Sequence, residues 1–206
     1  MESIVRQTLA RHREDPPLGI ELMLPVHHHM DQDFCAAVSK DLREYCAAWE
    51  KRLAIPDLWK QLPAESGVYV FVFASPLYLQ TTSEMFSPAW VLYVGRAGDA
   101  NSRRTIRDRY KGEYGKYIGK DPDILWTSVP CSSREDRLSL YLTIYPLFYW
   151  YATVEDRERI PFIEDRLIKL LAPMINGRQL PRVDPKPHNL LSGELPDDEQ
   201  DIHSGV

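Results

Sequence analysis

The sequence lacks the features that place a chain in a membrane or in an oxidising compartment. It contains no run of about 18 apolar residues, the length that crosses a bilayer. No apolar stretch follows Met1, so we expect no signal peptide. The three cysteines, Cys35, Cys46 and Cys131, are odd in number and far apart, so they match neither a disulfide framework nor a zinc cluster. These absences predict a cytoplasmic protein without a membrane anchor.

The remaining composition is that of one folded domain. Of the 206 residues, 44% are hydrophobic and 27% are charged, which excludes wholesale disorder and fibrous structure. The segment 181–206 differs, because it holds four prolines and six acidic residues against two basic ones. We expect it to be a flexible acidic tail.

Positive charge is also scarce overall. The chain has 25 Lys and Arg against 30 Asp and Glu, a net charge of −5 that by itself argues against nucleic acid as a partner. The distribution is uneven, however. Segment 96–120 holds eight basic and three acidic residues, so it carries +5 and the rest of the chain −10. A local basic block of this kind is a candidate phosphate-binding surface.

The pattern of apolar residues predicts an α/β (α+β) fold, with a small central antiparallel or mixed sheet flanked by helices. An N-terminal helical extension is expected over 1–65, and the loop 74–89 is expected to project. The predicted helices are 33–54, 103–111 and 161–171. The predicted strands are 67–73, 90–94, 124–129 and 138–154, the last broken at Pro146. The apolar stripe on 33–54 is a packing face or a dimer interface.

Five short features occur in order along this framework. They are Gly67-Val68-Tyr69, Tyr93-Val94-Gly95, the arginine-rich segment 105–110, Glu164 and, just beyond a proline, Asn176. In this order the features resemble the GIY-YIG nuclease family, which is named for the two tripeptides. The resemblance spans about half of the chain and implies a GIY-YIG-like core with insertions over 66–180.

The resemblance implies hydrolysis of DNA phosphodiester bonds with a single metal ion, Mg²⁺ or Mn²⁺, bound by Glu164. Tyr69 is then the general base or a proton relay, and Tyr93 orients the water or the phosphate. Arg109 stabilises the transition state, and Asn176 supports the site. Because the pKa of an ordinary tyrosine is about 10, Tyr69 needs a nearby cation to act as a base.

Two positions depart from the family's pattern. The usual spacing after the second tripeptide is shorter and fits Arg103, whereas the flanking apolar residues favour Arg109. Arg107 is a third candidate, on a different side of the helix from Arg109. One turn later, where the family often has Tyr or His, this chain has Glu113, next to Tyr114, and either Tyr114 or Tyr117 is a candidate to replace the family's residue.

The other candidate residues are those suited to holding a phosphate backbone. Basic side chains neutralise phosphates, and a glycine permits close approach by a phosphate. The substrate-binding candidates are Gly95, Arg96, Arg103, Arg104, Lys111, Tyr114 and Lys116.

We therefore expect a compact endonuclease of the restriction or phage-defence type that acts on DNA and is able to act as a homodimer. The competing hypotheses are a catalytically silent nucleic-acid-binding or protein-interaction module of the same fold, and a nuclease activated by a regulatory protein partner.

Overall fold

A four-stranded antiparallel sheet forms the middle layer of the molecule. The computed structural model describes residues 19–20, 24–120, 124–125, 133–176 and 182–183. The strands lie in the order β2-β7-β3-β6, and each pairs with its neighbours in antiparallel fashion. Their bounds are Glu50–Leu53 (β2), Gly67–Ala74 (β3), Ala89–Ala97 (β6) and Leu147–Thr153 (β7). The predicted α+β class is confirmed, with the antiparallel form of the sheet.

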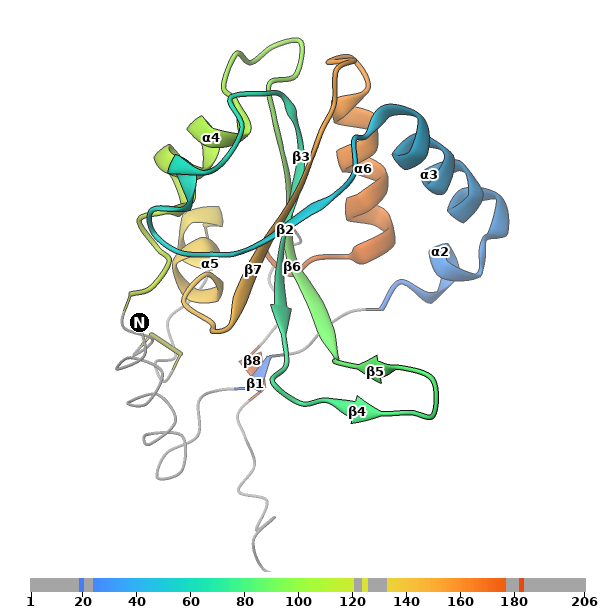
Figure 1. Ribbon diagram of the computed structural model, residues 1–206, viewed down its shortest axis with the longest axis vertical. Helices are drawn as coiled ribbons and strands as arrows, with labels where there is room; N and C mark the ends of the chain where they lie inside the picture. Colours follow the sequence, from blue (N-terminus) through green and yellow to red (C-terminus); the bar gives the residue numbers. More distant parts are fainter. Residues whose placement is uncertain (1–18, 21–23, 121–123, 126–132, 177–181, 184–206) are drawn as a thin grey trace, which may run out of the picture.

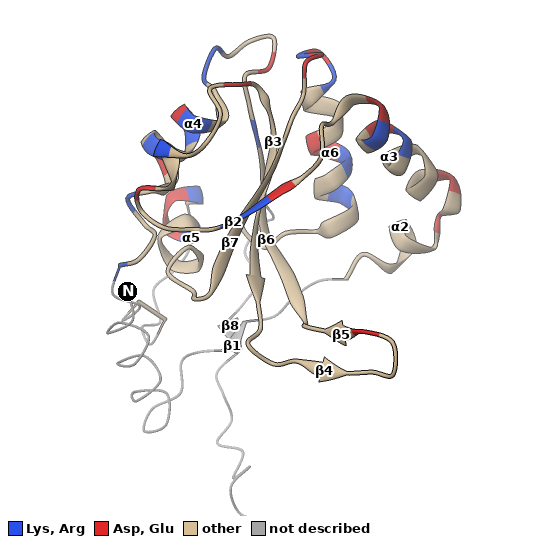
Figure 2. Ribbon diagram, viewed as in Figure 1, with Lys and Arg blue, Asp and Glu red and all other residues tan. Residues whose placement is uncertain are grey.

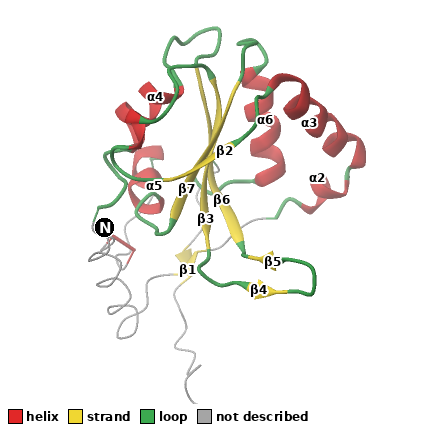
Figure 3. Cartoon of the chain, viewed as in Figure 1, coloured by secondary structure: helices red, strands yellow, loops and turns green. Residues whose placement is uncertain are grey.

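Helical elements cover both faces of this sheet (Figures 1 and 3). One face carries α2 (Val26–Met30), α3 (Gln32–Tyr45) and α6 (Ile160–Leu171). The other carries a 3-10 helix (Leu58–Lys60), α4 (Ile106–Arg109), a π-helical turn (Tyr110–Tyr114) and α5 (Arg134–Tyr141). None of the helices formed by the described residues is long and apolar enough to cross a membrane.

Strand β3 shows why the sheet is covered on both sides. Successive side chains of a strand point to opposite faces. Val68 and Val70 pack with Ile163 of α6, whereas Tyr69 and Phe71 belong to the cluster beneath α4 and α5. The strand is buried along almost its whole length, which its continuous apolar sequence requires. The α4/α5 face is rich in tyrosine, and the site is built on that face.

The predicted helix over 33–54 is wrong in its second half. Asp31 caps the start of α3, with its carboxylate accepting from the Phe34 backbone N–H, but the helix ends at Tyr45. Residues 50–53 instead form edge strand β2, paired with β7. The helix α3 packs against α6 of the same chain, with Leu42 and Tyr45 against the cluster that contains Ile163, and Val38 of its apolar stripe is buried.

The predicted strand over 138–154 is likewise only partly correct. Residues 134–141 form α5, because Ser133 and Asp136 make a reciprocal capping box that starts a helix. Pro146 does end this segment, and β7 follows as predicted. Ile124 and Leu125 lie in a helical turn rather than a strand, and 126–129 lie outside the described residues.

Two short strand pairs complete the fold. The loop 74–89 contains a small hairpin of β4 (Leu79–Gln80) and β5 (Met85–Phe86), which projects from the end of the sheet (Figure 1). Strands β1 (Gly19–Ile20) and β8 (Arg182–Val183) pair with each other. The rest of the predicted tail lies outside the described residues.

Candidate functional site

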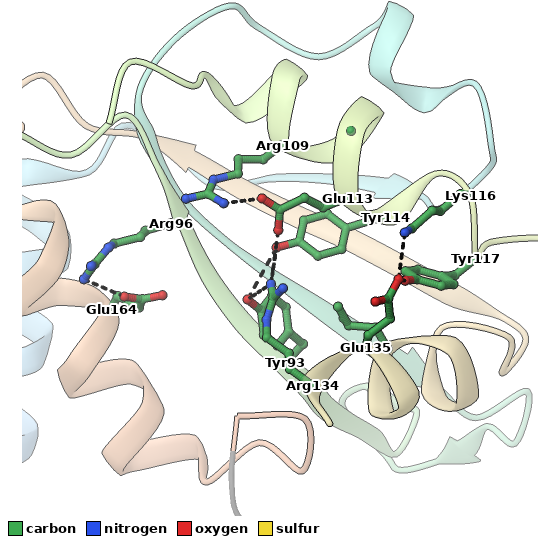
Figure 4. Close-up of a pocket in the computed structure, with 12 residues that line it drawn as sticks. Tyr93, Arg96, Arg109, Glu113, Tyr114, Lys116, Tyr117, Arg134, Glu135 and Glu164 are labelled. Atoms are coloured by element: carbon green, nitrogen blue, oxygen red, sulfur yellow. Dashed lines mark hydrogen bonds and ion pairs between the residues drawn. The ribbon is translucent and has the colours of Figure 1, made fainter. Parts of the chain in front are cut away.

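A cleft of about 470 Å³ lies between α4, the π-helical turn, α5 and α6, next to β6 (Figure 4). Charged and phenolic side chains line most of it. The basic residues are Arg96, Arg109, Lys116 and Arg134, the acidic ones are Glu113, Glu135 and Glu164, and the tyrosines are Tyr93, Tyr114 and Tyr117. The cleft therefore brings together residues of three of the five predicted features.

The local sequence explains how α4 and its continuation face the cleft. Thr105 and Asp108 form a capping box at the start of α4. The helix then widens, and the Gly115 N–H donates to the Tyr110 carbonyl oxygen at 2.9 Å, five residues back. Such π-turns are often found at functional sites. The widened turn carries Glu113 and Tyr114 on the cleft wall one turn after Arg109.

Three tyrosine hydroxyls form a chain that leads from the core to the cleft. The hydroxyls of Tyr69 and Tyr114 lie 2.7 Å apart, and the Tyr114 hydroxyl donates weakly to that of Tyr93 at 3.4 Å. Nη2 of Arg134 donates to the Tyr93 hydroxyl at 2.7 Å and to that of Tyr114 at 3.1 Å. The outermost hydroxyl thus accepts from two groups, which leaves its own proton to donate into the cleft.

Tyr69 lies behind this wall and not on it. Its side chain is 1% exposed, and Tyr114 separates it from the cleft. Burial raises the pKa of the Tyr69 phenol well above its usual value, and the nearby Arg109 opposes this only weakly. The phenol is therefore protonated at neutral pH. Of the two roles predicted for Tyr69, the geometry suits a relay through Tyr114 better than a base that contacts substrate.

Position 95 requires glycine because the Tyr69 ring occupies the space that a side chain would need. A Cβ on Gly95 would lie 2.5 to 2.7 Å from three atoms of the Tyr69 phenol. The space beside this glycine, predicted to admit a phosphate, is therefore filled by the Tyr69 ring.

We expect Gly95→Ala to lower the free energy of unfolding by about 1–3 kcal/mol, because the buried phenol has no room to move. Gly112→Ala is the matched control, since nothing lies within 4 Å of a Cβ there. It should leave stability unchanged or raise it by up to about 1 kcal/mol. Urea unfolding of both variants measures the difference, and equal stabilities would contradict the packing argument.

The three candidate arginines lie in three different places. Arg109 lines the cleft and pairs with Glu113. Arg107 points away, and its Nε donates to the Leu62 carbonyl oxygen at 2.8 Å. Arg103 lines a separate cavity beside Ser66 and Arg157. Only Arg109 is placed to act on a ligand in the cleft.

Glu113 is the central anion of this part of the site. Oε1 contacts Arg109 and, at 3.2 Å, Nη1 of Arg104, while Oε2 contacts Nη2 of Arg134 at 3.2 Å. Burial raises the pKa of Glu113, but its hydrogen bonds and attraction to Arg109 and Arg134 outweigh this, so the net pKa is lowered. The carboxylate is ionised and holds three guanidinium groups around it.

Glu164 faces the cleft from α6, paired with Arg96. Nη1 of Arg96 lies 2.8 Å from Oε2 of Glu164, and Nε of Arg96 lies 2.8 Å from Oδ2 of the buried Asp99. Burial raises the pKa of Glu164, although Arg96 and Arg109 oppose the shift. Arg96 therefore bridges two carboxylates at one end of the cleft.

The donor set agrees with one hydrated cation and not with a closed metal cage. Among the described residues, no group of three or more His, Cys, Asp or Glu could hold a metal ion. Mg²⁺ needs only one or two carboxylates, with water and substrate phosphate completing its shell. Arg96 contacts one oxygen of Glu164, and the other points away from Arg96 (Figure 4). Glu164 is thus a suitable single ligand.

Asn176 acts on the backbone beneath the site. Its Oδ1 accepts from the Val94 N–H and its Nδ2 donates to the Val94 carbonyl oxygen, both at 2.8 Å. Val94 is fully buried, so no water replaces these bonds. The side chain therefore fixes β6 next to Tyr93, in agreement with the supporting role implied for it.

We expect Asn176→Ala to lower the free energy of unfolding by about 2 kcal/mol, because two buried backbone groups lose their partners. Asn101→Ala, on an exposed turn, should change it by less than about 0.5 kcal/mol. Thermal and urea unfolding compare the pair, and an equally stable Asn176→Ala variant would contradict this role.

The other substrate-binding candidates are dispersed around the cleft. Lys116 lies on the rim, 3.0 Å from Glu135. Arg104 is exposed behind Glu113, and the Lys111 ammonium lies over the Trp59 ring, 4.4 Å from its centre. In Figure 2, basic and acidic residues lie close to one another on α4 and α5. Two basic residues of 96–120 pair with acids from outside the segment, Arg96 with Glu164 and Lys116 with Glu135, which offsets part of its +5 charge.

Sequence reasoning missed Arg134 and Glu135 as residues of the cleft, whereas Tyr114 and Tyr117, the two candidates for the family's Tyr or His, both line it. Arg134 and Glu135 follow Ser133, and the spacing of Ser133 and Asp136 is that of a capping box. This signal predicts a helix start and would have placed both side chains on its first turn.

Comparisons of the chain with protein-family models, with curated proteins and with solved structures gave no match.

Proposed function

We propose that the cleft is the active site of a metal-dependent endonuclease that hydrolyses DNA phosphodiester bonds. The observation that carries the proposal is the convergence of Tyr93, Arg109 and Glu164 on one cleft from β6, α4 and α6. A guanidinium stabilises charge on the phosphoryl oxygens, a single carboxylate is able to hold a hydrated divalent cation, and a phenol orients the water or the phosphate, so the three groups together suit phosphodiester hydrolysis with one metal ion.

Each of the three groups has a distinct task. Arg109 carries a permanent charge in a partly buried place, where it stabilises the negative charge that develops on the phosphoryl oxygens. Tyr93, whose oxygen already accepts from Arg134, keeps its proton and donates a hydrogen bond to a phosphate oxygen or to the oxygen of the attacking water, which orients that group. A divalent cation held by Glu164 would lower the pKa of a bound water and neutralise charge on the phosphate.

Tyr69 and Tyr114 support this arrangement from behind. Their hydrogen bond fixes the Tyr114 hydroxyl, which in turn donates to Tyr93. Because Tyr69 is buried and protonated, it acts through Tyr114, by orienting the chain of hydroxyls along which a proton is relayed. A role in restriction or phage defence, and action as a homodimer, remain predictions.

Incubation with supercoiled plasmid tests the proposal. We expect nicked and linear DNA with Mg²⁺ or Mn²⁺ and intact plasmid with EDTA. If the protein leaves plasmid and linear duplex intact with both metals at high concentration, the enzyme hypothesis fails for the isolated chain. Cleavage that appears only on adding a second protein would support the partner-activated alternative.

A further inference from the structure

The residues that line the cleft carry four positive and three negative charges, and the positive excess is concentrated around Glu113. Arg96 has two carboxylates, Asp99 and Glu164, and Lys116 has Glu135. In contrast, Arg104, Arg109 and Arg134 share the single carboxylate of Glu113. This group of four side chains therefore carries two positive charges beyond its internal compensation, and such an excess attracts an anion.

Two of these arginines approach Glu113 from different sides. Arg109 contacts Oε1 and Arg134 contacts Oε2, so each guanidinium holds a separate oxygen of one anion (Figure 4). The planar fork of arginine matches carboxylate and phosphate alike. Glu113 thus sets the positions of two groups that are suited to two oxygens of a phosphate.

Both guanidinium groups keep donors for a ligand. All three polar contacts of Arg134 within the cleft, to Tyr93, Tyr114 and Glu113, are made by Nη2, and Nη1 and Nε make no hydrogen bond to another described residue. Arg109 contacts Glu113 through Nη1 and its Nε is buried, so Nη2, which has no hydrogen-bond partner among the described residues, is its donor for a ligand. The Arg134 side chain is 47% exposed, so a substrate can reach it.

We propose that Arg134 is the second phosphate-binding cation of the cleft and that it acts with Arg109 on the two non-bridging oxygens of the same phosphodiester. The proposal rests on the function proposed above for the site. Arg134 also donates to Tyr93, so it holds the phenol and the phosphate next to each other. Arg134 is therefore both a binding residue and the residue that orients Tyr93.

The test measures DNA binding and cleavage separately. Anisotropy of a labelled duplex in Ca²⁺, over a series of salt concentrations, gives the affinity and its salt dependence for the full chain. We expect Arg134→Ala to weaken binding about 10-fold or more and to lower the slope of log K against log salt by about one. Arg159→Ala removes an equal charge from an exposed arginine paired with Asp156 and should change neither quantity.

Arg134→Lys is a second variant that is less prone to a folding defect. It keeps the positive charge of the side chain and loses the planar guanidinium with its paired donors. It should bind nearly as well as the wild type but cleave at least about 10-fold more slowly.

Wild-type affinity and slope in Arg134→Ala, or wild-type cleavage in Arg134→Lys, would overturn the proposal and leave the nuclease assignment standing. If the wild type binds and Arg134→Ala weakens this while no variant cleaves, the phosphate site stands and the nuclease assignment fails. Absence of DNA binding by the wild type overturns both.

Discussion

Glu164→Ala is expected to reduce metal-dependent cleavage of plasmid by about a thousandfold or more, because the cleft loses its ligand for the divalent cation. DNA binding in Ca²⁺ should change little, since the proposal assigns phosphate affinity to Arg109 and Arg134. Single-turnover cleavage rates over a range of Mg²⁺ concentrations measure the effect. Glu164→Gln should behave in the same way, because an amide retains the shape and loses the charge.

Asp165→Ala is the matched control for this prediction. Asp165 follows Glu164 on α6, but it is exposed and pairs with Lys169. Its loss should leave the cleavage rate within about twofold of the wild type. Equal cleavage by Glu164→Ala and wild type would remove Glu164 from the metal site. A fall in melting temperature that matches the loss of rate would attribute the effect to folding.

Arg109→Ala is expected to slow cleavage by about a hundred- to a thousandfold, the usual loss when one preorganised charge at a phosphoryl group is removed. Arg104 and Arg134 still compensate Glu113 in this variant, so the fold should persist. Substrate affinity should fall less than the rate, because the charge matters most in the transition state. Steady-state kinetics on a defined duplex separates the two effects.

Arg107→Ala provides the contrast. Its side chain bonds to the Leu62 carbonyl oxygen outside the cleft, so its loss should cost about 1 kcal/mol of stability and far less rate. A larger loss of rate in Arg107→Ala than in Arg109→Ala would transfer the catalytic role to Arg107 and contradict the placement in the cleft.

The elements that the sequence predicts well are those whose signal is local. Strands β3 and β6 are rich in valine and aromatic residues, and Pro161 lies at the start of α6. The sequence predicts a helix over 46–53, where the structure has none, because no helix-breaking residue follows Tyr45 and the helical spacing of apolar residues continues to Leu53. Its strand state is decided by pairing with β7, about a hundred residues along the chain, which periodicity does not report.

The residues of the site also divide into those with a local signal and those without one. The sequence points to Tyr93, Arg109 and Glu164 because each lies in a short motif on a predicted element. It does not indicate that three arginines surround Glu113, because Arg134 reaches Glu113 from α5 through tertiary packing alone. The sequence also does not predict that Tyr69 is buried behind Tyr114. An aromatic residue on a strand shows the same sequence pattern whether its side chain faces the core or a cleft.

The position of Asn176 has a consequence for how the protein is made. Its side chain anchors to Val94, which lies 82 residues earlier, and α6 must pack on β6 before Glu164 can face Tyr93. During synthesis the ribosome exposes Tyr93 and Arg109 well before Glu164 and Asn176 emerge. A nascent chain therefore has no assembled cleft until it has grown past Asn176. If the chain is a nuclease as proposed, its activity therefore arises in the cell only after translation has passed Asn176.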